Sequence, residues 1–106
     1  MFPSNHRLPR PQFVVLRRIG KKIHHPLFSI VYTPSPSQNS RAGIIVSAKV
    51  VPSAVSRNLL KRRLRSAVSV IFPKLNPPLD FIIIAKPASL HTSASLLTQS
   101  LNQAFE

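Results

Sequence analysis

Residues 54–72 read AVSRNLLKRRLRSAVSVIF, and this stretch decides the fold. Apolar residues recur within it at spacings of three and four: Leu60, Leu64, Ala67, Val68 and Ile71. On a helix of about 3.6 residues per turn these positions form one stripe, which needs another element to cover it. Ser53 precedes the stretch as a candidate N-cap, and Pro73 follows it as a stop. The sequence therefore predicts a helix over residues 54–72 that rests on a sheet through its apolar stripe.

Cations crowd the side of this helix that faces away from the stripe. Five of the nine residues from 57 to 65 are Lys or Arg. At about 100° per residue, Arg63 stands alone on one flank. The other polar positions form one continuous arc, which holds Arg57, Asn58, Lys61, Arg62 and Arg65.

Repulsion along this arc argues for a polyanionic partner. Arg57, Lys61 and Arg65 are spaced four residues apart, and each like-charge pair at this spacing costs a helix about 0.2–0.5 kcal/mol. A solvated helix face usually alternates the sign of its charges, but this helix contains no acid. Guanidinium groups bind phosphates bidentately, and an asparagine can add a directional hydrogen bond. The arc is therefore predicted to bind phosphate groups, in preference to serving as a solubilising face.

The charge balance of the whole chain points the same way. Its 106 residues include 15 Lys and Arg but two acids, Asp80 and Glu106, which gives a net charge of +13. Because such an excess repels itself in a compact state, the expected partner is a polyanion: nucleic acid first, an anionic membrane second. The absence of cysteine excludes disulfides and thiolate metal sites. No apolar run could cross a bilayer and no secretory signal is visible, so the cytoplasm is the expected compartment.

The rest of the chain predicts two helices and three strands around the central helix. In chain order they are a helix between Pro11 and Gly20, strands over residues 27–33, 42–50 and 81–85, and a helix capped by Thr92 or Ser93. The first two strands could pair as a hairpin across a long loop. The third strand shows no alternation, so it is predicted to be buried on both faces.

These elements predict one domain over residues 1–106, with residues 1–10 as a loose basic arm. The fold class is α+β, and the architecture is a two-layer α/β sandwich.

No catalytic constellation is visible in the sequence. Asp80 begins a strand and Glu106 is the last residue, so a working pair of carboxylates is not expected. The adjacent His24 and His25 would point to opposite faces of a strand, which argues against a metal site. With two glycines in the chain, a glycine-rich phosphate loop cannot form. The chain is expected to contain no catalytic residue and to hold no metal of its own.

The ordered motifs resemble those of the protein component of bacterial ribonuclease P. Residues 57–65 fit the family's signature Arg-Asn-x-x-Lys-Arg-x-Leu-Arg, and residues 42–50, AGIIVSAKV, are similar to its strand Gly-x-x-Val-Ser-x-Lys-Val. Residues 80–85, DFIIIA, are similar to its late strand. The first helix and first strand also fit, at Phe13, Arg17, Arg18, Gly20 and Pro26-Leu27-Phe28.

The chain also departs from the family pattern at four positions. Leu59 stands where the family usually has Arg, and Ala48 replaces a common Lys. Val51 replaces a common Gly, and Ser66 replaces a common acidic residue. The loss of two cations is expected to weaken contact with RNA locally.

This resemblance implies a mixed sheet of about four strands with a left-handed βαβ crossover, as in one class of ribosomal protein domains. It implies that a catalytic RNA subunit, with magnesium held mainly by that RNA, removes the 5′ leader of precursor tRNA. The expected partners are ribonuclease P RNA, at one protein per RNA, and precursor tRNA, with neither DNA nor a membrane. The residues expected to contact the RNA subunit are Arg57, Asn58, Lys61, Arg62, Arg63 and Arg65, with Ser47 and Lys49 near the start of that surface. A leader cleft between the first helix and the sheet is expected to use Phe13, Arg17 and Tyr32.

Two other functions share part of this pattern. A ribosomal-type structural RNA-binding protein would have the same charge and a similar fold, without a role in cleavage. A membrane-active cationic protein would need an exposed apolar stripe, but the strands need that stripe for a core. Phe13 and Tyr32 could equally be core residues, and Phe28 is assigned to the core. The ordered set of matched motifs favours the ribonuclease P function.

Overall fold

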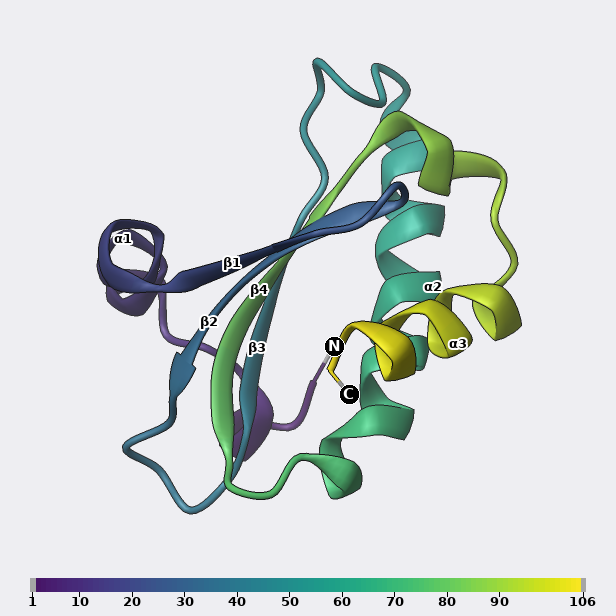
Figure 1. The fold of residues 1–106 in the computed structure, drawn as a ribbon. Coiled ribbons are helices and arrows are strands. Elements are labelled where there is room, and N and C mark those ends of the chain that lie inside the picture. The colour runs from purple at the N-terminus through teal and green to yellow at the C-terminus, as the bar shows by residue number, and fades with distance from the viewer. Residues whose placement is uncertain (1, 106) are drawn as a thin grey trace.

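A four-stranded mixed sheet forms the centre of the molecule, with helices on both faces (Figure 1). The structure, a computed structural model, describes residues 2–105. Its elements, with η for a short 3₁₀ helix, are η1 (Ser4–His6), α1 (Arg10–Ile19), β1 (Lys21–His24), β2 (Phe28–Pro34), β3 (Arg41–Ile45), α2 (Ala54–Ile71), η2 (Phe72–Lys74), β4 (Leu79–Ala85), η3 (Pro87–His91) and α3 (Ala94–Ala104). The predicted α+β class is confirmed.

The strand order is β1-β2-β4-β3, so β4 lies between the two strands that were predicted to pair as a hairpin. β2 and β4 are antiparallel, whereas β3 and β4 are parallel. The predicted hairpin is wrong, because a strand that is apolar on both faces needs a central position. Phe81, Ile82 and Ile83 of β4 are each fully buried, which confirms the prediction of burial on both faces.

One predicted strand is much shorter than expected, and one strand was not predicted. β3 ends at Ile45, five residues early, because Ser47 forms a turn instead: its hydroxyl accepts a hydrogen bond from the Lys49 N–H at 3.0 Å. The short strand β1 was not predicted at all. Three of its four residues are exposed, so it carries no alternating pattern, and its lysines suit a sheet edge that must not pair with another chain.

The parallel neighbours β3 and β4 are joined by a crossover through α2. In Figure 1 this βαβ crossover is left-handed, the uncommon sense that the family resemblance implied. The predicted apolar stripe of α2 is buried against the sheet, with Leu60 and Leu64 at 0% exposure. The predicted N-cap also holds, because the Ser53 hydroxyl accepts a hydrogen bond from the Ser56 N–H at 3.3 Å.

α3 packs beside α2 on the same face of the sheet (Figure 1). Of its two candidate caps the structure uses Ser93, whose hydroxyl accepts from the Leu96 N–H at 3.2 Å. α1 instead covers part of the opposite face, where Leu16 packs with Val31 and Ile82. The two-layer sandwich therefore carries a partial third layer.

The N-terminal segment is docked, so the prediction of a loose arm over residues 1–10 is wrong for the described residues. Phe2 is buried and meets the Phe72 ring edge-on at 5.3 Å between centroids, and His6 stacks on the same ring at 4.4 Å. Leu8 is buried on the other face, and its N–H donates to the Ala42 carbonyl at 3.1 Å. Two apolar side chains in a basic segment are enough to anchor it.

A bidentate ion pair connects β3 to β4. Arg41 donates from Nε to one oxygen of Asp80 at 2.9 Å and from Nη2 to the other at 2.6 Å. The hydrogen bond to Asp80 is the main cause that raises the pKa of Arg41 above its ordinary value. The Asp80 side chain is 4% exposed and that of Arg41 is 17% exposed, so the carboxylate depends more on its partner.

We expect Arg41→Met to lower the free energy of unfolding by roughly 3 kcal/mol, because it leaves a buried carboxylate without a counter-charge. Asp80→Asn should lower the free energy of unfolding clearly less, because the Arg41 guanidinium that loses its partner can reach water. Urea unfolding followed by circular dichroism measures both losses. Equal losses, or a larger loss for Asp80→Asn, would contradict this asymmetry.

Candidate nucleic-acid interface

Two of the arginines expected to bind RNA are held by backbone carbonyls. Arg57 Nη1 donates to the carbonyls of Val51 at 3.0 Å and Pro52 at 2.7 Å, which fastens the turn before α2. Arg63 Nη1 donates to the Leu90 carbonyl at 3.0 Å and so links α2 to η3. Arg57 reaches back to the turn before the helix, and Arg63 reaches a segment far along the chain, so helical periodicity could not reveal either contact.

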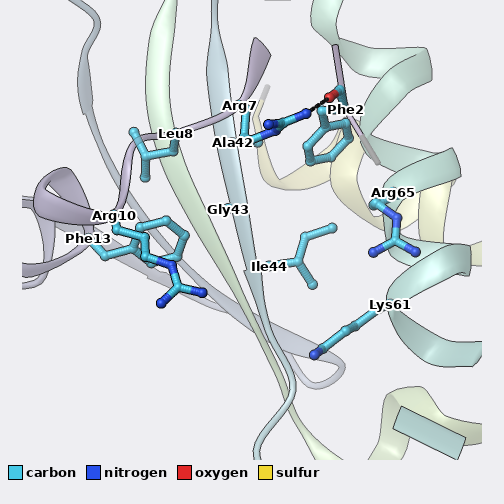
Figure 2. Close-up of a pocket in the computed structure, with 10 residues that line it drawn as sticks. All are labelled: Phe2, Arg7, Leu8, Arg10, Phe13, Ala42, Gly43, Ile44, Lys61 and Arg65. Carbon is cyan, nitrogen blue, oxygen red and sulfur yellow. Dashed lines mark hydrogen bonds between the residues drawn. The ribbon is translucent and has the colours of Figure 1, made fainter. Parts of the chain in front are cut away.

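Lys61 and Arg65 face a groove between α2, the edge strand β3 and the start of α1 (Figure 2). The groove has a volume of about 290 Å³, and four cations line it: Arg7, Arg10, Lys61 and Arg65. Within the described chain, its lining includes no acidic side chain. Because low-dielectric walls focus the field of such charges, the groove attracts anions.

The N-terminal arginines of the groove were missed at the level of sequence. Arg7 and Arg10 both lie in the segment that was predicted to be loose. Docking of that segment places both side chains opposite α2, and Arg7 Nη2 donates to the Phe2 carbonyl at 3.0 Å (Figure 2). The signal that could have found them is the pair of apolar residues, Phe2 and Leu8, that anchors the segment.

The aromatic ring of Phe13 lines the same groove and lies against Gly43 of β3 (Figure 2). Any side chain at position 43 would overlap this ring, so glycine is required there for close approach. Phe13 is half-buried, which leaves part of the ring open to the groove. The structure thus brings Phe13, expected in the leader cleft, together with Lys61 and Arg65, expected on the RNA subunit.

The other two residues expected in the leader cleft lie elsewhere. Tyr32 packs against the core on the α2 and α3 face of the sheet, so it does not join Phe13. Its position follows from the two-residue period of β2, which places it on the same face as Phe28 and Ile30. Arg17 is exposed on α1 one helical turn after Phe13, outside the lining of the groove.

The remaining predicted residues lie on the outward side of α2 and in the turn before it. Asn58 and Arg62 are exposed, and Lys49 is exposed in the turn after β3. Ser47 is half-buried and stabilises that turn. Arg62 also borders a second hollow of about 370 Å³, lined by Phe2, Arg62, Arg65, Ser66 and Ser69.

Arg65 lines both hollows, so a continuous run of cations leads from the groove across α2 to Arg62.

Over residues 2–105, no three His, Asp or Glu side chains come together as a set of metal ligands. None of the helices in the same part of the chain combines the length and the apolar character that a membrane span needs.

We expect Gly43→Ala to cost about 1–3 kcal/mol of unfolding free energy, because its methyl group would displace the Phe13 ring. In a Phe13→Ala background the same substitution should cost much less, since the ring is gone. A four-member urea-unfolding cycle measures the coupling. A cost that is the same in both backgrounds would contradict the stacked arrangement.

Comparisons with known proteins identify the family. The Ribonuclease P family profile matches residues 2–106. The ribonuclease P protein component of Desulfatibacillum aliphaticivorans is 36% identical over 96 residues, which cover 91% of this chain and 80% of that protein. The protein of the same name from Synechococcus elongatus is 36% identical over 105 residues, with 93% and 86% covered.

The fold matches as well. The ribonuclease P protein of Thermotoga maritima superposes with a TM-score of 0.82 at 22% identity, over 93% of this chain and 94% of the other. A ribonuclease P protein mutant from Staphylococcus aureus gives a TM-score of 0.82 at 25% identity, over 93% and 84%. Because the family profile matches nearly the whole chain and the relatives are 36% identical over most of it, this chain belongs to the ribonuclease P protein family.

Proposed function

We propose that this chain is the protein subunit of ribonuclease P, which binds the catalytic RNA and the 5′ leader of precursor tRNA. The observation that carries the proposal is that polar side chains occupy two adjoining sides of α2, with Arg65 where the two sides meet. Lys61 and Arg65 face the groove, whereas Asn58 and Arg62 face outward. One helix can therefore contact two RNA segments at once.

The groove suits a single-stranded leader. Single strands are bound by aromatic stacking platforms together with cations that follow the backbone, and stacking contributes about 1–3 kcal/mol per base. Phe13 offers the ring, and Arg10, Lys61 and Arg65 surround it. The groove also opens along the edge strand β3, where an extended chain can lie.

The outward surface of α2 suits a folded RNA. Arg62 can bind phosphate oxygens bidentately, and Asn58 and Lys49 extend the surface toward the start of the helix. Because these contacts release counterions, affinity for the RNA should fall steeply with salt concentration. One such surface per chain supports a complex of one protein with one RNA.

The catalytic chemistry belongs to the RNA in this proposal. Magnesium ions held by the RNA activate water and stabilise the leaving oxygen of the phosphodiester. The protein's cations offset repulsion between the leader and the catalytic RNA, so less magnesium is needed for binding. Asp80, the acid within the described residues, is buried and forms a bidentate ion pair with Arg41. Its carboxylate is therefore not free to take part in the reaction. The assembly works in the cytoplasm, where precursor tRNA is processed.

The first test is reconstitution with the cognate ribonuclease P RNA at low magnesium concentration. We expect the protein to increase the cleavage rate of precursor tRNA and to co-purify with that RNA. Co-purification with ribosomal RNA, without any increase in cleavage, would contradict the proposal and indicate a ribosomal-type structural protein.

The groove is tested by the double variant Lys61→Gln with Arg65→Gln. We expect the reconstituted enzyme to bind precursor tRNA about 10- to 100-fold more weakly, because two charge-assisted phosphate contacts are lost. Binding of tRNA without a leader should change less than twofold. Arg18→Gln, an exposed cation outside the groove, is the matched control. An equal loss for both tRNAs would show that the groove does not hold the leader.

A further inference from the structure

The exposed side of α2 carries an apolar pair beside its cations. Val55 is 78% exposed and Leu59 is 43% exposed, and their spacing of four residues makes them neighbours on the helix. Asn58 and Arg62 complete the same stripe, at three and seven residues after Val55. The apolar pair therefore lies within the surface proposed to bind folded RNA.

We propose that Val55 and Leu59 form an apolar contact with an unpaired nucleotide of the catalytic RNA, next to the phosphate that Arg62 binds. This inference rests on the proposed function. An unstacked base or a ribose offers an apolar face a few ångströms from a phosphate, which matches an apolar pair beside a guanidinium group. Leu59 is also the position at which this chain lacks the Arg of the family pattern.

Charge argues for RNA as the occupant. A second copy of this chain would bring another net charge of +13, and Asp80, the acid within the described residues, is buried. Self-association through a surface that contains Arg62 would therefore oppose like charges. A nucleic acid supplies both the negative charge and the apolar faces.

Geometry selects the catalytic RNA over the leader. Leu59 and Lys61 are two positions apart on α2, which places their side chains about 160° apart around the helix axis. A leader in the groove beside Lys61 therefore cannot cover the apolar pair at the same time.

The contact has a signature that a phosphate contact lacks. Binding through phosphates releases counterions and sets the slope of log affinity against log salt concentration. An apolar contact involves no counterions, so it multiplies the affinity by the same factor at every salt concentration. Removing the pair should therefore shift the line without tilting it, whereas removing Arg62 should tilt it.

The test uses three variants. The first is the double variant Val55→Ala with Leu59→Ala, the second is the control double variant Ile19→Ala with Leu96→Ala, and the third is Arg62→Gln. Alanine keeps a helix stable, and the control residues Ile19 and Leu96 are 69% and 49% exposed on α1 and α3, away from this stripe of α2. Binding to the catalytic RNA alone, without precursor tRNA, is measured from low to high salt. We expect about 3- to 10-fold weaker binding at every salt concentration for the Val55 and Leu59 variant, with an unchanged slope. The control should stay within twofold, and Arg62→Gln should flatten the slope.

Chemical probing of the RNA gives the second measurement. We expect the wild-type protein to protect an unpaired base that the Val55 and Leu59 variant leaves reactive. Unchanged affinity, a changed slope, or an equal loss for the control would each overturn the inference while leaving the proposed function intact. Failure of the wild-type protein to bind the catalytic RNA would instead overturn the proposed function, and this inference with it.

Discussion

The burial of one apolar stripe fixes the orientation of everything else on α2. Leu60 and Leu64 are pressed against the sheet at 0% exposure, so the polar positions between them must point away from the core or along its flanks. Burial of a leucine is worth about 1.5–3 kcal/mol, whereas each like-charge pair on the same helix costs a few tenths. The core therefore holds a crowded row of cations in place without any internal acid to neutralise them. A polyanion is the natural partner of such a surface.

Packing also divides that row into surfaces with different tasks. Arg57 and Arg63 bind backbone carbonyls at the ends and flank of the helix, while Lys61 and Arg65 meet cations from the N-terminal segment across the groove. The division arises because β3 and the docked N-terminal segment lie along one side of α2. A uniform basic face would bind RNA without distinguishing its segments, whereas a divided face can position a single strand beside a folded RNA.

The sequence predicted local features and missed those set by distant contacts. The start and cap of α2, its end to within one residue, and the burial of β4 on both faces follow from local sequence features, so they were predicted. Strand pairing depends on which strand can be buried on both faces. The hairpin prediction was wrong because β4, and not β3, takes the place beside β2. Tyr32 was placed by residue type, but its face of β2 is decided by register. Arg7 and Arg10 join the site because Phe2 and Leu8 anchor the N-terminal segment.

The central claim, that the two sides of α2 contact different RNAs, can be tested by site-specific cross-linking. The chain contains no cysteine, so a single cysteine can carry a photoactivatable group at a chosen position. Cysteine at Arg10, in the groove, should cross-link to the 5′ leader in the assembled complex, and cysteine at Asn58 should cross-link to the catalytic RNA. Cross-links from both positions to the same RNA segment would contradict the account.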